Sequence, residues 1–220
     1  MNPLLQITGS LRPVALTLML LMATAAFPTP GSWGKGFTGY ELSSKLPSSI
    51  PDLDSIVNHA KYLEKTASDL KEEICRIHNL CDNSNEALAE NNLLLPNITE
   101  RDGCLPSSFN EETCLIKIIS GLQDFDIFLN YMETEMEDNR FQTLKLSTTQ
   151  LANTLKTVIK KTDLVPTTNP TTSSILLSEL QSLTAWSRKV GFRLILWHYT
   201  RFIQGTVRAV RYLKTRSLDA

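Results

Sequence analysis

Apolar residues recur every three or four positions from Ile50 to Ile77, and this period constrains the fold more than any other feature of the chain. Such spacing places the apolar side chains on one stripe of an α-helix. Similar stripes follow further along the chain, and no stretch shows the period-two alternation of a β-strand. The four expected helices cover 52–78, 109–137, 140–162 and 174–214, the last with a bend at Gly191. The sequence therefore predicts an all-α domain.

The lengths of the connections between these helices restrict how the helices are arranged. A 25-residue helix is about 38 Å long. About four residues join the second helix to the third and reach only ~13 Å, so these two helices must be antiparallel neighbours. The other two connections are long enough to return along a bundle. The spacing thus permits a long-chain four-helix bundle with up-up-down-down topology and two long crossover loops.

The N-terminus predicts export from the cell. Val14 to Ala26 is an unbroken run of apolar or small residues that ends in Ala23-x-Ala25. Residues 1–25 are therefore expected to be a signal peptide. This run spans about 20 Å as a helix, too short to cross the ~30 Å core of a membrane. Residues 26–48, rich in Gly, Pro and Ser, are expected to form a flexible tail, and 49–216 a single domain. We expect a secreted, extracellular product without membrane insertion. Among exported proteins, a bundle with two long crossovers is typical of helical cytokines.

The four cysteines predict two disulfide bonds, because the secretory route is oxidising and their number is even. Three pairings are possible. The short separations within Cys75/Cys81 and within Cys104/Cys114 favour local bridges without proving them. A metal site is the competing interpretation, since His78 lies between Cys75 and Cys81. Surface positions explain His59 and His78 more simply, so we expect no metal and no cofactor.

The C-terminal part of the chain is strongly basic. Leu180 to Leu218 contains eight Lys or Arg residues and no Asp or Glu. Arg201, Arg208 and Arg211 are seven and three positions apart and share one helix face, away from the apolar stripe. A basic face can bind nucleic acid, a heparin-like glycan or an acidic receptor surface. Export argues against nucleic acid, and a merely solvated face is the remaining alternative.

One acceptable N-glycosylation sequon occurs, at Asn97-Ile98-Thr99, because the proline in Asn169-Pro170-Thr171 blocks the other. Glycosylation at Asn97 would require an exposed loop. Ser108-x-x-Glu111 then predicts a capping box at the start of the second helix.

No motif supports enzymatic activity. Gly34-x-Gly36-x-x-Gly39 matches the dinucleotide fingerprint by letters, but no strand precedes it. No zinc-protease, nucleophile-elbow or P-loop motif occurs, and three His provide few bases. The acidic run Glu133–Asp138 is expected to be a solvated helix end. We therefore expect a binding protein. Trp186 fits either the core or an exposed anchor for a partner.

One spaced motif carries a resemblance to a known family. It is Cys104-x9-Cys114-x6-Gly121-Leu122-x2-Phe125-x3-Leu129. The chain thereby resembles the interleukin-6 and granulocyte colony-stimulating factor family of helical cytokines. Four further segments, Glu86–Leu93, Asp102–Cys104, Phe109–Leu115 and Arg208–Arg211, are similar to members of this family.

The resemblance implies the disulfide pairs Cys75–Cys81 and Cys104–Cys114 and three receptor-binding surfaces. The first surface, for a specific α-receptor, uses Arg208, Arg211 and Phe109. Leu105 stands where familiar members have a second aromatic residue. The second, for the shared signal-transducing receptor, includes Tyr62 and Lys61, with Thr66 in place of a glycine. The third, for a second copy of that receptor, comprises Trp186, Leu88, Glu90 and Asn91.

The resemblance also implies a function without catalysis. A monomeric bundle would bind its α-receptor and then dimerise the shared receptor. The cytoplasmic kinases of that receptor would thereby be activated in immune and acute-phase responses. Weak binding of heparin-like glycans is compatible with this role. Two alternatives stay open: a secreted heparin- or lipid-binding helical carrier, and a sister cytokine of the same family.

Overall fold

The computed structural model of the chain describes residues 52–81, 93–160, 162–167 and 170–218. All of them belong to one compact unit, Pro47–Ala220. The expected signal peptide and tail lie outside the described residues. Leu88, Glu90 and Asn91, expected on the third receptor surface, also lie outside them.

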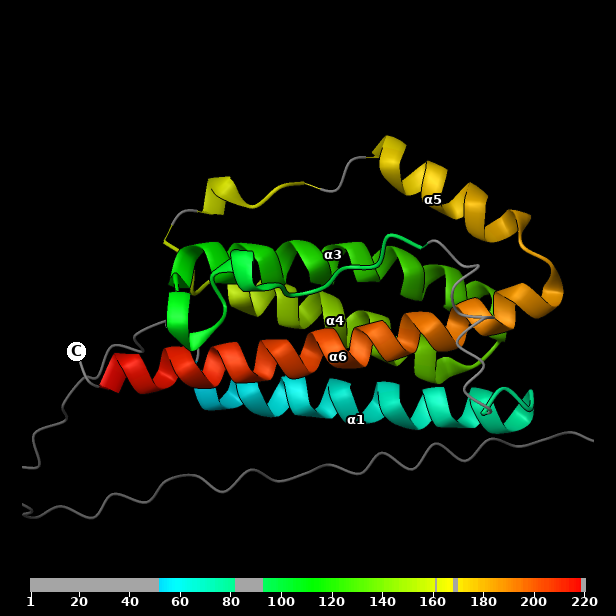
Figure 1. The fold of residues 1–220 in the computed structure, drawn as a ribbon, viewed down its shortest axis with the longest axis horizontal. Coiled ribbons are helices and arrows are strands. Elements are labelled where there is room, and N and C mark those ends of the chain that lie inside the picture. The colour runs from blue at the N-terminus through cyan, green and yellow to red at the C-terminus, as the bar shows by residue number, and fades with distance from the viewer. Residues whose placement is uncertain (1–51, 82–92, 161, 168–169, 219–220) are drawn as a thin grey trace, which may run out of the picture. The chain divides into compact units, whose positions relative to one another are not determined.

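The described part of the chain is helical and contains no β-strand, which confirms the predicted all-α class. Its helices are α1 (Leu53–Ile77), α3 (Glu111–Met136), α4 (Asn139–Lys156), α5 (Pro170–Ser182) and α6 (Ala185–Leu218) (Figure 1). The first two expected helices agree with α1 and α3 to within two residues at each end. The apolar period predicts the extent of α1 well, because buried residues such as Leu63, Leu70 and Ile74 occupy one stripe of this helix.

Three ion pairs at the helix ends define the directions of the four long helices. Each pair joins the first part of one helix to the last part of another, so the two helices are antiparallel. The pairs are Lys214–Asp54 (2.6 Å), Arg140–Glu73 (2.6 Å) and Arg188–Glu135 (3.0 Å). It follows that α1 and α3 run in one direction and that α4 and α6 run in the other.

A cluster of aromatic rings in the core joins α3, α4 and α6. The Phe125 ring of α3 lies 5.2 Å from the Tyr199 ring and 5.4 Å from the Phe202 ring of α6, between centroids. The Tyr199 hydroxyl lies 2.5 Å from the Thr148 hydroxyl of α4. Because Thr148 donates its proton to the Leu144 carbonyl, Tyr199 must donate to Thr148. Burial raises the pKa of Tyr199, which keeps this donor protonated.

Gly121 in the spaced motif has a packing reason. A Cβ atom at this position would lie 2.3 Å from Cζ of Phe202, so only glycine lets that ring lie against α3. Phe125 and Leu129 of the same motif are fully buried. The motif therefore contains residues through which α3 packs against α6.

The third expected helix, 140–162, is too long at its C-terminal end. Helix α4 ends at Lys156, where the amides of Thr157 and Val158 bond to carbonyls three residues back instead of four. Thr157, Val158 and Ile159 are β-branched and lower helix propensity. Ile159 is nevertheless buried, so it maintains the apolar pattern from outside the helix.

The fourth expected helix, 174–214, consists of α5 and α6, and the predicted bend at Gly191 is replaced by a break at Leu183–Thr184. The Thr184 hydroxyl accepts a hydrogen bond from the Ser187 amide at 3.2 Å, as an N-cap does. This bond starts a new helix, and α6 continues through Gly191.

The predicted capping box at Ser108 and Glu111 is also wrong. Asn110 caps α3 instead, with its side-chain oxygen accepting from the Thr113 amide at 3.0 Å. Ser108 belongs to a 3₁₀ turn, Pro106–Ser108, which precedes the cap.

Candidate binding surfaces

Two disulfide bonds join Cys75 to Cys81 and Cys104 to Cys114. The second bridge attaches the segment before α3 to the first turn of that helix. All four cysteines are therefore oxidised, which removes the thiolates that a metal site at His78 would need. Within the described ranges no group of three His, Cys, Asp or Glu could hold a metal ion. No helix in these ranges is long and apolar enough to cross a membrane.

Three arginines form an exposed basic face on α6, namely Arg201, Arg208 and Arg211. None of them takes part in an ion pair with a described residue. Nearby Lys214, by contrast, is bound to Asp54 at 2.6 Å. The guanidinium groups of this α6 basic face consequently retain their donors for a partner.

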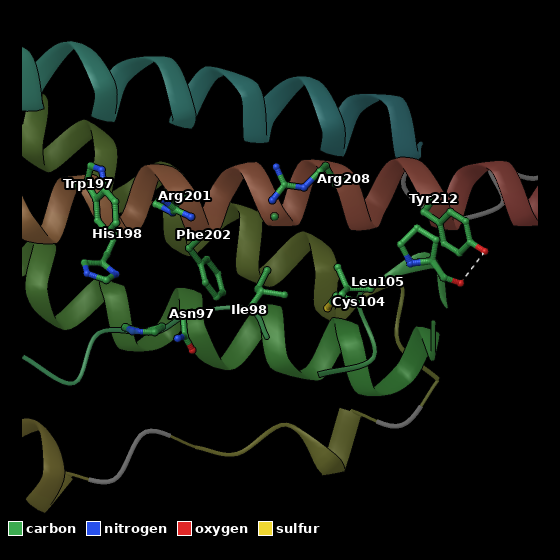
Figure 2. Close-up of a pocket in the computed structure, with 13 residues that line it drawn as sticks. Asn97, Ile98, Cys104, Leu105, Trp197, His198, Arg201, Phe202, Arg208 and Tyr212 are labelled. Carbon is green, nitrogen blue, oxygen red and sulfur yellow. Dashed lines mark hydrogen bonds between the residues drawn. The ribbon is translucent and has the colours of Figure 1, made fainter. Parts of the chain in front are cut away.

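A cleft lies between α6 and the segment 96–106 (Figure 2). Its volume is about 450 Å³. Figure 2 shows Asn97 and Ile98 on the segment and Trp197, His198, Arg201 and Phe202 on the facing part of α6. Leu105, Arg208 and Tyr212 also line this α6 cleft, which is therefore continuous with the α6 basic face.

Trp197 and its neighbours give the α6 cleft an aromatic and basic wall. The guanidinium carbon of Arg201 lies 4.7 Å from the centroid of the Trp197 ring, a cation–π contact. The ring remains 41% exposed. Burial lowers the pKa of His198, and the charge of Arg201 lowers it further. The wall can thus contact an apolar group and a carboxylate together.

Phe109 lies beside the α6 basic face through a contact with the next residue after Arg211. Its ring meets Tyr212 of α6 edge-on, with 4.8 Å between centroids. The Tyr212 hydroxyl donates to the Pro106 carbonyl at 3.5 Å, a weak bond at this length. The structure thereby brings together Phe109, Arg208 and Arg211. Leu105 is partly buried and lines the α6 cleft.

The second expected surface lies on α1. Tyr62 is 51% exposed, and Lys61 is exposed beside it. Thr66 donates its hydroxyl proton to the Tyr62 carbonyl at 2.9 Å, so its side chain lies along the helix. Leu146 on the adjacent helix α4 is 60% exposed, and the sequence analysis did not name it as a surface residue. Its position off the apolar stripe of that helix could have indicated this exposure.

The third expected surface is represented by Trp186 alone within the described residues. Trp186 is 55% exposed in the first turn of α6, so it is not a core residue. Two positions later, Arg188 pairs with Glu135 of α3 and fixes this end of α6.

Trp197, His198, Tyr212 and Ile98 are among the cleft residues that the sequence analysis did not single out. Trp197 precedes Arg201 by four positions, a spacing that places both on one helix face. This signal could have indicated Trp197. No comparable signal exists for Ile98, because its position opposite α6 depends on the long-range path of the loop.

Comparisons with known proteins agree with this fold. The sequence model of the Interleukin-6/G-CSF/MGF family matches residues 28–213. Interleukin-6 from Delphinapterus leucas is 40% identical over 207 residues, which cover 92% of this chain and 99% of that protein. Interleukin-6 from Sus scrofa is 39% identical over 209 residues, covering 94% of this chain and 98% of that protein.

A solved structure titled as the crystal structure of a cytokine/receptor complex has the same fold. Its TM-score is 0.63 at 23% identity, with 73% of this chain and 97% of that chain covered. The spaced motif, the helical bundle and the family match all lead to one assignment. The chain belongs to the Interleukin-6/G-CSF/MGF family of cytokines.

Proposed function

We propose that the chain is a secreted cytokine resembling interleukin-6 that binds a specific α-receptor. The complex then dimerises a shared signal-transducing receptor and activates its cytoplasmic kinases in immune and acute-phase responses. The chain acts by binding and has no catalytic role.

One observation carries this proposal: Arg208 and Arg211 are exposed beside Phe109 and have no carboxylate partner among the described residues. A guanidinium group donates two parallel hydrogen bonds to a carboxylate, which favours an acidic receptor surface. Aromatic and Arg side chains together are typical of binding hot spots. Phe109 would supply the apolar centre of such a contact.

The length of α6 supports two separate receptor contacts. Trp186 and Arg208 lie on the same continuous helix, and 22 residues separate them, or about 33 Å along its axis. A receptor bound at Arg208 would leave Trp186 free for another receptor. Each contact can be of moderate affinity, because the first one raises the local concentration of the next partner.

The names of the relatives support the same assignment. The relatives are interleukin-6 proteins, and the structural neighbour is titled as a cytokine bound to a receptor. Secretion fits the apolar run at Val14 to Ala26 and the two disulfide bonds.

Stepwise assembly with receptor ectodomains tests the proposal. The purified chain without residues 1–25 is mixed with the α-receptor ectodomain, and light scattering is recorded before and after the shared receptor is added. We expect a one-to-one complex first and then an assembly with two shared receptors. Failure to bind any α-receptor, together with heparin retention that falls steeply with salt, would instead indicate a glycan-binding carrier. Binding only to receptors of another member would indicate a sister cytokine.

A further inference from the structure

The sequon at Asn97 lies at the edge of the surface proposed to bind the α-receptor. Asn97 is exposed in an extended segment before the first 3₁₀ turn, Glu100–Asp102. No described residue forms a hydrogen bond with its side-chain amide. The Thr99 side chain is exposed as well, with its hydroxyl 2.7 Å from the Asp102 carboxylate. Both residues that define the sequon are therefore accessible from solvent.

Asn97 also lies at the edge of the α6 cleft. It lines this cleft together with Trp197, Arg201 and Arg208 (Figure 2). A group attached to Asn97 would begin at the rim of the cleft, on the segment that lies across the cleft from α6. Arg201 and Arg208 are only seven residues apart on α6, about 10 Å along the helix. An oligosaccharide of several sugar rings exceeds this distance.

We propose that Asn97 carries an N-linked oligosaccharide that covers the α6 cleft and slows binding of the α-receptor. This inference rests on the proposed function, because it concerns the regulation of the same surface. In the modification step, the Asn97 side-chain nitrogen forms a bond to C1 of the sugar. The bond from C1 to the diphosphate of a lipid-linked oligosaccharide donor breaks, and the amide nitrogen loses one proton.

The chemistry of the cleft favours a glycan held against the protein. Arg201 and Arg208 have no carboxylate partner in the described part of the chain, so their N–H groups can donate to sugar hydroxyls. Trp197 offers an exposed aromatic surface on the same wall, on which the apolar face of a sugar ring can pack. These contacts would place the first sugars where the receptor approaches Arg208.

The effect should appear in the association rate. A covering glycan must move aside before the receptor docks, which lowers the fraction of productive encounters. The contacts of the final complex remain, so dissociation should change less. Asn97→Gln should leave folding unaffected, since Asn97 is exposed, and Thr99→Ala removes only the hydrogen bond of an exposed hydroxyl to Asp102.

The test compares the chain from a secretory eukaryotic host with the chain from a bacterial host that attaches no N-glycans. In each host the wild type is made together with Asn97→Gln, Thr99→Ala and Thr99→Ser. The first two variants destroy the sequon, and Thr99→Ser preserves it. Mass spectrometry reports glycan occupancy, and surface plasmon resonance with the α-receptor ectodomain reports the association rate.

We expect glycan on the eukaryotic wild type and on Thr99→Ser, and about tenfold slower association for both than for the two sequon-free variants. In the bacterial host all four chains should associate at the same fast rate. An unoccupied Asn97, or equal association rates with and without glycan, would overturn the inference. In either case, receptor binding by the bacterial chain that is lost in Arg208→Glu would leave the proposed function intact. A bacterial wild-type chain that does not bind the receptor would refute both.

Discussion

The ring of Phe109 meets the ring of Tyr212 edge-on, with 4.8 Å between their centroids and 68° between their planes. Phe109 comes from the segment before α3, whereas Tyr212 follows Arg211 directly on α6. The contact therefore holds an aromatic side chain of the loop beside the basic face of the helix. Two segments far apart in sequence form one surface in this way.

Replacing Phe109 by Ala should separate receptor affinity from stability. An edge-on ring pair of this kind contributes about 0.5–1.5 kcal/mol, and Phe109 is only partly buried, so unfolding should become easier by about 1–2 kcal/mol. Loss of a central aromatic anchor should weaken α-receptor binding by at least about thirtyfold. Calorimetry of receptor binding and urea unfolding measure the two effects. Phe109→Tyr, which retains the ring, is the control and should retain most of the affinity.

Replacing Trp186 by Arg should abolish signalling without affecting the α-receptor. Trp186 is 55% exposed, so the change should alter the unfolding free energy by less than about 0.5 kcal/mol. Its distance from Arg208 along α6 should leave α-receptor affinity unchanged. Receptor titration and a cell reporter of kinase signalling check both expectations. Normal signalling by the folded variant would show that Trp186 does not contribute to receptor binding.

Two glycines of the bundle should respond differently to substitution by Ala. At Gly121 the new Cβ would lie 2.3 Å from Cζ of Phe202, a buried ring that cannot turn away. We expect Gly121→Ala to cost about 1–3 kcal/mol. At Gly205 the nearest atom, 2.8 Å away, is Cδ1 of the partly buried Ile98, whose side chain can rotate. Gly205→Ala is thus the matched control with the smaller expected effect. Equal losses of unfolding free energy in the two variants, measured by chemical denaturation, would contradict the close packing of Phe202 on Gly121.

Stability should fall as the pH is lowered from 7 to 5. Burial lowers the pKa of His59, His78 and His198. The unfolded chain therefore takes up protons first as the pH drops through about 6.5, which favours unfolding. Above that pH these residues are neutral in both states and contribute nothing. Urea unfolding at pH 5, 6 and 7 should show a smaller decrease for His198→Gln than for the wild type, and an identical decrease would disprove the role of His198.

The sequence predicted those parts of the fold that follow from local periodicity. Helices α1 and α3 have buried stripes that coincide with their apolar residues, so their bounds were nearly right. The end of α4 and the start of α6 depend instead on single hydrogen bonds, such as the one from the Ser187 amide to Thr184. Apolar Ile159 continues the pattern although it lies beyond the helix. Periodicity alone cannot distinguish these cases.

The candidate site likewise has one part that local sequence patterns predict and another part that they do not. The shared face of Arg208 and Arg211 follows from helix geometry and was predicted. The α6 cleft depends on where the loop carrying Ile98 crosses α6, and no local rule defines such a long-range contact. The family motif adds information about long-range contacts, because its Gly121 is required by the close approach of Phe202.

The central claim is that the α6 basic face is the main contact with the α-receptor, and affinity measurement of Arg208→Glu tests it most directly. Arg208 is exposed and has no ion-pair partner among the described residues, so thermal unfolding should be nearly unchanged, within about 0.5 kcal/mol. Truncation of a hot-spot arginine costs about 2 kcal/mol or more, roughly thirtyfold in affinity, and charge reversal should abolish binding. Arg208→Lys should weaken it less, because a point charge retains attraction but not the paired donors. Loss of receptor binding by a normally folded Glu variant is the predicted result, and full affinity in that variant would contradict the account.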